Sequence, residues 1–243
     1  MISLQDLKHN CYINMEIKPI ALFRSPFKEK FGIPRQSNLI QELKGTIVLE
    51  KRFSSEQALR GLDGFEYIWL IWGFNLNPSE TVSLLVRPPR LGGNKKVGVF
   101  ASRSPFRPNP LGLSCVRIEE IDLTIGEIKV SGADLSDGTP IYDIKPYIPY
   151  SDAHSSAACG FADRVKWETL SVKPLNKDLE DKIKSYLCED DYGALLKCLE
   201  QDPRPQYQKK SSPHKIYGLH YSNYNITFIV DGDELTITDI TPL

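Results

Sequence analysis

The sequence predicts a mainly β protein, with an N-terminal β-barrel or sandwich followed by a smaller α+β part. Three observations indicate this fold class. Short runs of β-branched and aromatic residues fill the first 150 positions, Pro- and Gly-rich turns separate them, and no series of alternating strands and helices occurs. At roughly 150 residues per domain, a chain of 243 residues is long enough for two such units.

In the N-terminal part, the pattern predicts one short helix among several strands. Residues 65–74, FEYIWLIWGF, have the aromatic and β-branched composition of a fully buried strand. Residues 54–62 are expected to be helical, with Ser54 or Ser55 as the N-cap. The other expected strands are residues 13–22, 46–49, 81–86, 96–101, 113–121 and 127–131.

Composition changes after residue 150, where the small and polar residues 151–163 are typical of a linker. Asp231-Gly232 between two alternating apolar runs predicts a hairpin near the C-terminus. The expected C-terminal elements are a strand at 167–172, a helix capped by Asn176, a second helix at 192–199, and hairpin strands at 224–230 and 234–240. We therefore expect two domains, residues 13–152 and 161–243.

Composition excludes several classes of protein. The 30 basic and 31 acidic residues nearly cancel, and 41% hydrophobic residues is a globular value. The longest apolar run, residues 67–74, is far shorter than the ~20 residues of a membrane span, and residues 1–10 lack the apolar segment of a signal peptide. Five scattered cysteines without a Cys-x-x-Cys pair argue against a disulfide framework or a structural zinc site. We expect a cytoplasmic protein without membrane contact or bound metal.

One stretch is strongly basic although the whole chain is nearly neutral. Residues 81–118 contain no Asp or Glu but seven Lys and Arg residues, most of them beside Pro or Gly. A charge run is usually a solvated face, yet seven cations on stiff loops without an anion favour a polyanion site. A second cluster at 204–217 interleaves two tyrosines with cations, and there base stacking and a plain solvated surface are equally good interpretations.

Sequence motifs of several enzyme classes are absent. No Gly-x-Gly-x-x-Gly follows a strand, and no P-loop, Gly-x-Ser-x-Gly, His-Glu-x-x-His or zinc-deaminase pattern occurs. These absences disfavour Rossmann and P-loop nucleotide binding, serine hydrolysis and zinc catalysis. The four histidines are dispersed and are better explained as surface or capping residues than as ligands.

Four segments together carry a family resemblance. They read RSPFK and GIPRQ within 24–36, RPPRLGGN at 87–94, SRSPFRPNPLG at 102–112, and DLSDGTP followed by DIKPY within 134–147. In this order they resemble the TsaA/TrmO family, the YaeB-like bacterial tRNA N6-adenosine methyltransferases, over residues 15–152. The later segment QDPRPQY at 201–207 resembles the C-terminal domain of the bacterial members.

The resemblance implies an S-adenosylmethionine-dependent enzyme built on a β-barrel rather than a Rossmann fold, which also explains the missing glycine motif. The family reaction methylates N6 of N6-threonylcarbamoyladenosine (t6A) at position 37, beside the anticodon of threonine tRNAs, and gives m6t6A. Family members are homodimers.

Carried over by position, the resemblance also implies a cofactor site. Arg103 would pair with the methionine carboxylate, Leu113 would pack on adenine, and Asp137 would hydrogen-bond adenine or ribose. Without the resemblance, Asp137 would be interpreted as a turn cap. The implied cofactor contacts are Pro34, Arg35, Gln36, Asn75, Leu76, Arg103, Leu113, Leu135, Ser136, Asp137 and Gly138.

For the chemistry, we expect Asn109 or Asp137 to face the N6 proton during in-line methyl transfer. The residues expected to contact tRNA are Arg87, Arg90 and Arg107 in the first domain and Arg204, Tyr207, Lys209 and Lys210 in the second. The second group could equally support a dimer surface. Two alternatives stay open: a non-catalytic RNA- or nucleotide-binding β-barrel, and a methyltransferase on the same scaffold with a different acceptor.

Overall fold

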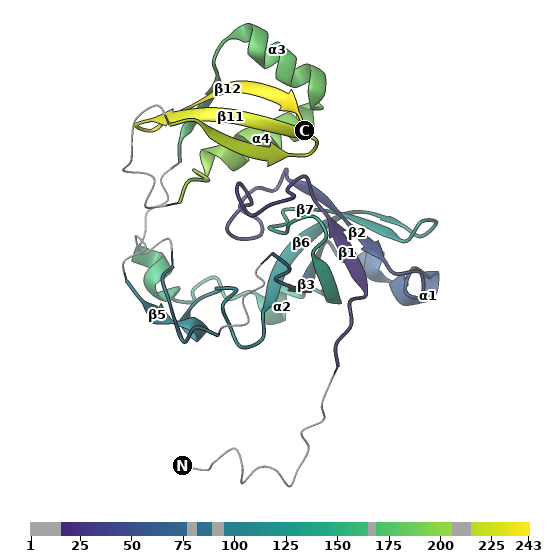
Figure 1. Cartoon of the computed structure of the whole chain (residues 1–243). Helices are drawn as coiled ribbons and strands as arrows, with labels where there is room; N and C mark the ends of the chain where they lie inside the picture. The colour runs from purple at the N-terminus through teal and green to yellow at the C-terminus, as the bar shows by residue number, and fades with distance from the viewer. Residues whose placement is uncertain (1–15, 77–81, 89–94, 165–168, 206–214) are drawn as a thin grey trace.

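The computed structural model describes residues 16–76, 82–88, 95–164, 169–205 and 215–243. It confirms the expected fold class: a closed six-stranded barrel is followed by a smaller α+β unit (Figure 1). In the described part of the chain, no helix is both long and apolar enough to cross a membrane.

The barrel is antiparallel throughout and closes between its first and last strands, which removes free sheet edges. Its interior follows from strand alternation: Ile68 and Leu70 are fully buried, whereas Trp69 and Ile71 between and after them face outward. The strand order is β1 (Ala21–Arg24), β2 (Lys44–Leu49), β7 (Glu127–Ser131), β6 (Leu111–Asp122), β3 (Tyr67–Gly73) and β8 (Pro140–Pro146).

Several short helices and turns and a small two-stranded sheet lie outside the barrel strands. Ser55 caps the first helix, because the Ala58 amide donates to its hydroxyl oxygen over 3.4 Å. These elements are α1 (Glu56–Leu59), α2 (Pro149–Asp152), the two-stranded sheet of β4 (Leu85–Val86) and β5 (Val97–Gly98), and 3-10 turns at Leu62–Gly64, Val99–Ala101 and Gly160–Arg164.

The C-terminal unit is a four-stranded sheet on which two helices pack. Asn176 caps the first helix by accepting the Leu179 amide over 2.9 Å, as expected. In sheet order the strands are β10 (Tyr217–Tyr221), β11 (Tyr224–Asp231), β12 (Glu234–Pro242) and β9 (Ser171–Pro174), and the helices are α3 (Lys177–Tyr186) and α4 (Glu189–Glu200).

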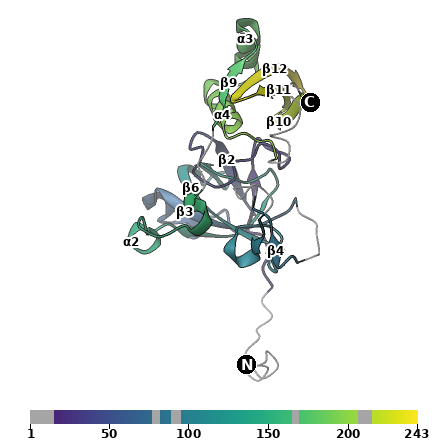
Figure 2. The ribbon, with the colours of Figure 1, turned by 90° about the vertical axis from the view of Figure 1, so that its left-hand side faces the viewer.

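The loop between β1 and β2 joins the two units. Phe27, Ile40 and Leu43 of this loop are buried in the same apolar cluster as the C-terminal sheet. The Phe27 ring meets Tyr221 edge-on at 5.3 Å between ring centres, and the Ser222 amide donates to the Pro26 carbonyl over 2.7 Å. In Figure 2 the C-terminal unit therefore lies directly above the barrel, with this purple loop between them.

Several element predictions need correction. The run at 81–86 forms a strand only at Leu85–Val86, and the strand expected at 13–22 begins at Ala21 within the described residues. The C-terminal strand begins at Ser171, four residues later than expected. Strands β8 and β10 were not predicted, because Pro140, Asp143, Lys145 and Pro146 interrupt the apolar pattern of β8 and a basic, turn-rich segment precedes β10.

Candidate active site

A cavity of about 660 Å³ lies against the outward side of β3 and β6, at one end of the barrel. Four segments border it: the β1–β2 loop, residues 74–76 after β3, the segment between β5 and β6, and the segment between β7 and β8. Its volume falls within the range of small-molecule sites, roughly 300–1,000 Å³. Alternation explains part of its floor, because the outward-facing side chains Ile71 and Leu113 face this space, whereas Trp72 reaches it from the barrel core.

The floor of the cavity is apolar. Ile71 of β3 pairs with Leu113 of β6, which is 55% exposed, and both line the space. Trp72 and Phe74 pack edge-on with ring centres 4.5 Å apart at the end of β3. Such a surface suits a flat heteroaromatic ring.

A chain of hydrogen bonds runs from the barrel end into the cavity. The Trp72 indole Nε1 donates to Ser114 Oγ over 2.9 Å, and Ser114 Oγ donates to Asp134 Oδ1 over 2.5 Å. Gly112 leaves room for this arrangement, because a Cβ there would lie 2.3 Å from the Trp72 ring. Burial raises the pKa of Asp134, and the Ser114 hydrogen bond and the Arg103 charge oppose that rise.

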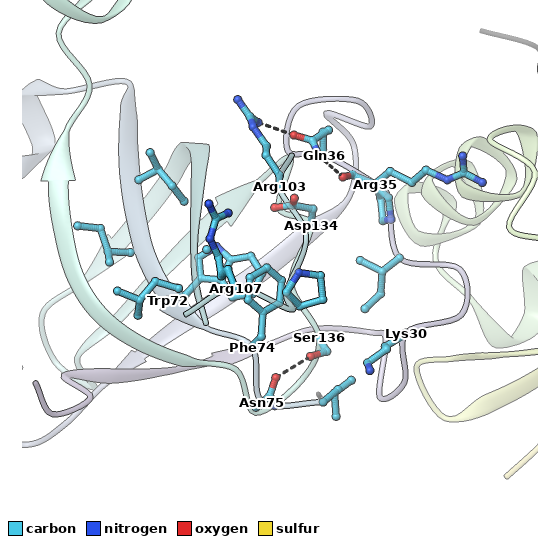
Figure 3. Close-up of a pocket in the computed structure, with 18 of the residues that line it drawn as sticks. Lys30, Arg35, Gln36, Trp72, Phe74, Asn75, Arg103, Arg107, Asp134 and Ser136 are labelled. Atoms are coloured by element: carbon cyan, nitrogen blue, oxygen red, sulfur yellow. Dashed lines mark hydrogen bonds between the residues drawn. The ribbon is translucent and has the colours of Figure 1, made fainter. Parts of the chain in front are cut away.

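The charge of the cavity is mainly positive. Lys30, Arg35, Arg103 and Arg107 line it, and among the described lining residues Asp134 is the only acidic one. Arg103 donates to the Gln36 side chain, and in Figure 3 the Asp134 carboxylate lies beside this pair. The site can therefore attract a carboxylate or phosphate while one carboxylate is held in place within it.

One wall of the cavity depends on the C-terminal unit. Pro34, Arg35 and Gln36 face the cavity from the β1–β2 loop, the loop that also supplies Phe27 to the C-terminal core. Gly32 makes this close approach possible: its φ is +91°, and a Cβ there would lie 2.3 Å from Leu219 Cδ1.

Eight of the expected cofactor contacts come together at this cavity. They are Pro34, Arg35, Gln36, Asn75, Leu76, Arg103, Leu113 and Ser136. The Asn75 carbonyl oxygen accepts from the hydroxyls of Ser136 and Thr139, each over 3.3 Å, so the segment before β8 is tied to the end of β3.

The remaining expected cofactor contacts lie outside the lining of the cavity. Leu135 is 2% exposed and belongs to the barrel core. The Asp137 carboxylate accepts the Ser25 amide over 3.2 Å and lies 3.8 Å from Arg24, while the Gly138 amide donates to Phe23. This turn thus connects β8 to β1. The contacts of Asp137 in the structure are those of a turn cap rather than of a residue that lines the cavity.

The expected catalytic and tRNA-binding residues are more scattered. Asn109 and Arg87 are exposed and neither lines the cavity, whereas Arg107 does. Arg204 requires correction: it is 6% exposed and forms a two-point ion pair with Asp202, so its guanidinium is not presented to a polyanion. Arg90, Tyr207, Lys209 and Lys210 lie outside the described residues.

Sequence reasoning missed Asp134, Trp72 and Phe74. Ser114 is an inward-facing polar residue in an apolar strand, which signals a buried partner without identifying it. Only the folded chain shows that this partner is Asp134. Within the described residues, no group of three His, Cys, Asp or Glu side chains could hold a metal ion.

Comparison with known proteins agrees with the resemblance seen in the sequence. The model of the tRNA-methyltransferase O N-terminal domain matches residues 22–153, and that of the TrmO C-terminal domain matches residues 171–243. The chain is 35% identical to the tRNA (adenine(37)-N6)-methyltransferase of Escherichia coli over 237 residues, which cover 94% of this chain and 99% of the relative.

Two further matches come from Pseudomonas aeruginosa. One, named "Putative S-adenosylmethionine-dependent methyltransferase RcsF", is 41% identical over 209 residues, which cover 84% of this chain and 87% of the relative. The crystal structure of TrmO from the same species superimposes with a TM-score of 0.76 at 32% identity, covering 94% of this chain and 97% of that one. The chain belongs to the TrmO family.

Proposed function

We propose that this chain transfers a methyl group from S-adenosylmethionine to N6 of adenosine 37 in tRNA. We further propose that the acceptor is t6A in threonine tRNA and that the product is m6t6A. The observation that carries the proposal is the cavity, which joins an apolar floor to a set of arginines in a chain whose relatives are named for this reaction.

The residues present fit S-adenosylmethionine. Arg103 and Gln36 offer donors for an amino-acid carboxylate, and the wall formed by Leu113 and Ile71 accepts an adenine ring. The bound group supplies an electrophilic methyl attached to sulfonium. The chain orients that methyl and the acceptor nitrogen and shields both from water.

The basic rim of the cavity fits an RNA loop. Arg107 lines the cavity, and Arg87, Lys95 and Lys96 are exposed on the adjoining segments. We assign the methyl transfer to residues 13–152 and tRNA docking to residues 161–243, assisted by Tyr207, Lys209 and Lys210. Adenosine 37 lies in a single-stranded loop, so its base can enter the cavity at lower free-energy cost than a paired base. The proposal implies a cytoplasmic location.

We also propose that the chain works as a homodimer, joined through the β4–β5 sheet and the 3-10 turn that follows. Leu84 is 72% exposed, Leu85 56% and Phe100 76%, so in the described part of the chain this segment presents large apolar side chains at the surface. The Phe100→Asp variant is expected to sediment as a monomer while the wild-type chain sediments as a dimer. A monomeric wild-type chain would exclude this part of the proposal.

The test of the activity uses threonine tRNA from cells that lack this gene. Incubation with the pure protein and S-adenosylmethionine should raise the mass of the position-37 nucleoside by one CH2 unit, measured by mass spectrometry of digested tRNA. Matched tRNA without the threonylcarbamoyl group is the control and should gain nothing. Methylation of both tRNAs would contradict the t6A requirement, and methylation of neither would contradict the reaction.

A further inference from the structure

We infer that Asp134 is the general base of the methyl transfer, the group that takes the proton from the acceptor nitrogen. This inference rests on the proposed function and adds a residue that lies outside the expected catalytic pair. The basis is its place: Asp134 is the only acidic residue among the described residues that line the cavity.

The position of Asp134 is fixed by a chain of two hydrogen bonds from buried side chains. Ser114 of β6 donates to its Oδ1 over 2.5 Å and is itself held by the Trp72 indole of β3 over 2.9 Å. Ser114 is 1% exposed and Trp72 8%, so both supporting side chains are locked by packing. A catalytic base held by buried partners keeps its orientation when the substrates arrive.

The cations that line the cavity together with Asp134 come from two loops, and Arg103 is the one whose charge acts on its carboxylate. Arg103 lies in the segment before β6, while Lys30 and Arg35 lie in the β1–β2 loop and Arg107 follows Arg103. The strands beneath contribute only the neutral Trp72 and Ser114. The hydrogen bond from Ser114 and the charge of Arg103 favour the ionised carboxylate, whereas burial disfavours it and raises the pKa of Asp134. A carboxylate with a raised pKa is a stronger base than an ordinary one.

The other two candidates are placed less well for this step. Asp137 is occupied by the Ser25 amide and by Arg24 outside the cavity lining. Asn109 is exposed, and an amide has no basic site for a proton at neutral pH.

In the proposed step, N6 of the acceptor gains a methyl group and loses a proton. The N6 lone pair forms a bond to the methyl carbon, the carbon–sulfur bond breaks, and its electron pair stays on sulfur. The N6–H proton passes to the Asp134 carboxylate and returns to solvent after the products leave. A sulfonium cation and a carboxylate anion thus become two neutral groups, a change that a desolvated cavity favours.

The test compares wild type with Asp134→Asn in single-turnover methyl transfer, at saturating cofactor and across pH. We expect the wild-type rate to fall on the acidic side as Asp134 becomes protonated. The variant should be roughly 10²–10⁴-fold slower, without that acidic limb. Its affinity for S-adenosylmethionine, measured by calorimetry, should stay within about threefold of wild type. Asp143→Asn is the matched control, because that carboxylate pairs with the exposed Lys145 and does not line the cavity.

A second variant keeps the inference testable if Asp134→Asn does not fold. Ser114→Ala removes the hydrogen bond that lowers the pKa of Asp134, so the acidic limb should move to higher pH. An Asp134→Asn rate within threefold of wild type would overturn the inference, and so would an unmoved acidic limb in Ser114→Ala. If weaker binding of S-adenosylmethionine accounts for the whole loss of rate, Asp134 is a binding residue and the inference is wrong. If the wild-type chain binds the cofactor but methylates no tRNA, the proposed function is wrong, and the inference about Asp134 is wrong with it.

Discussion

The two apolar cores of this molecule are built differently. The barrel core contains only residues of the N-terminal unit, from Ala21 to Ile141. The C-terminal core contains its own helices and sheet together with Phe27, Ile40 and Leu43 from the β1–β2 loop of the barrel unit. The barrel therefore packs around its own residues, whereas the second core needs a segment that lies more than a hundred residues earlier in the chain.

This difference changes how the C-terminal unit is understood. The loop that completes its core also carries Pro34, Arg35 and Gln36 to the cavity. The C-terminal unit thus supports one wall of the proposed cofactor site, in addition to any contact it makes with tRNA. Substitutions that weaken the C-terminal core should therefore lower the affinity for the cofactor. Equally destabilising substitutions inside the barrel, far from the cavity, should leave that affinity unchanged.

The largest effect is expected from Phe27→Ala. Phe27 is fully buried against Tyr221, so its loss should lower the free energy of unfolding by roughly 3–5 kcal/mol. Because the loop then loses its anchor, affinity for S-adenosylmethionine should also fall, as measured by calorimetry below the unfolding temperature. Ile128→Ala, in the barrel core and away from the cavity, is the control. If both variants bind the cofactor like wild type, the loop is not held by the C-terminal core.

A smaller decrease in the free energy of unfolding is expected from Gly32→Ala. The new Cβ meets Leu219 in a left-handed backbone conformation, which should cost about 1–3 kcal/mol in chemical denaturation. The double variant with Leu219→Ala removes part of the clash. Its loss should therefore be smaller than the sum of the two single losses, by on the order of 1 kcal/mol. Strict additivity would show that the two residues do not touch.

The smallest effect concerns an exposed ion pair across the two units, in which Lys197 donates to Glu42. This hydrogen bond lowers the pKa of Glu42 below its ordinary value of 4.5. The pair should stabilise the chain by less than about 1 kcal/mol near neutral pH, and Lys197→Ala should remove that gain. A lowered pKa means that the gain is complete above pH 4.5 and is lost as pH falls through the folded-state pKa.

Denaturation at several pH values checks this prediction, with high salt as the control because screening should also abolish the difference. If the difference in the free energy of unfolding between wild type and Lys197→Ala persists at low pH, the stabilisation comes from packing of the lysine stem rather than from the ion pair.

The sequence patterns correctly predicted the elements that depend on interactions between residues close together in the chain. The buried strand β3, the Asn176 cap and the hairpin at Asp231-Gly232 could be recognised because alternation, capping and turn chemistry lie within a few neighbouring residues. Strand β8 could not, since partners on β1 and β3, distant in sequence, determine its pairing.

The candidate site shows the same division. Arg103 and Gln36 come from motifs that the family resemblance covers, and the structure brings them together. Asp134 and Trp72 are joined only through Ser114, across segments that no local pattern relates. Arg204 was expected at a nucleic-acid surface, because a charge pattern does not show that its partner Asp202 lies beside it in a buried turn.

The cavity whose wall is the β1–β2 loop, anchored in the C-terminal core, is proposed to bind S-adenosylmethionine. Calorimetric titration of the full chain with S-adenosylmethionine tests it most directly, in wild type, Arg103→Ala and the control Arg52→Ala, whose side chain pairs with Glu50 away from the cavity. We predict that Arg103→Ala raises the Kd at least about tenfold, equivalent to roughly 1.4 kcal/mol, while Arg52→Ala leaves it unchanged. Equal affinity in all three proteins would place the cofactor elsewhere and contradict the account.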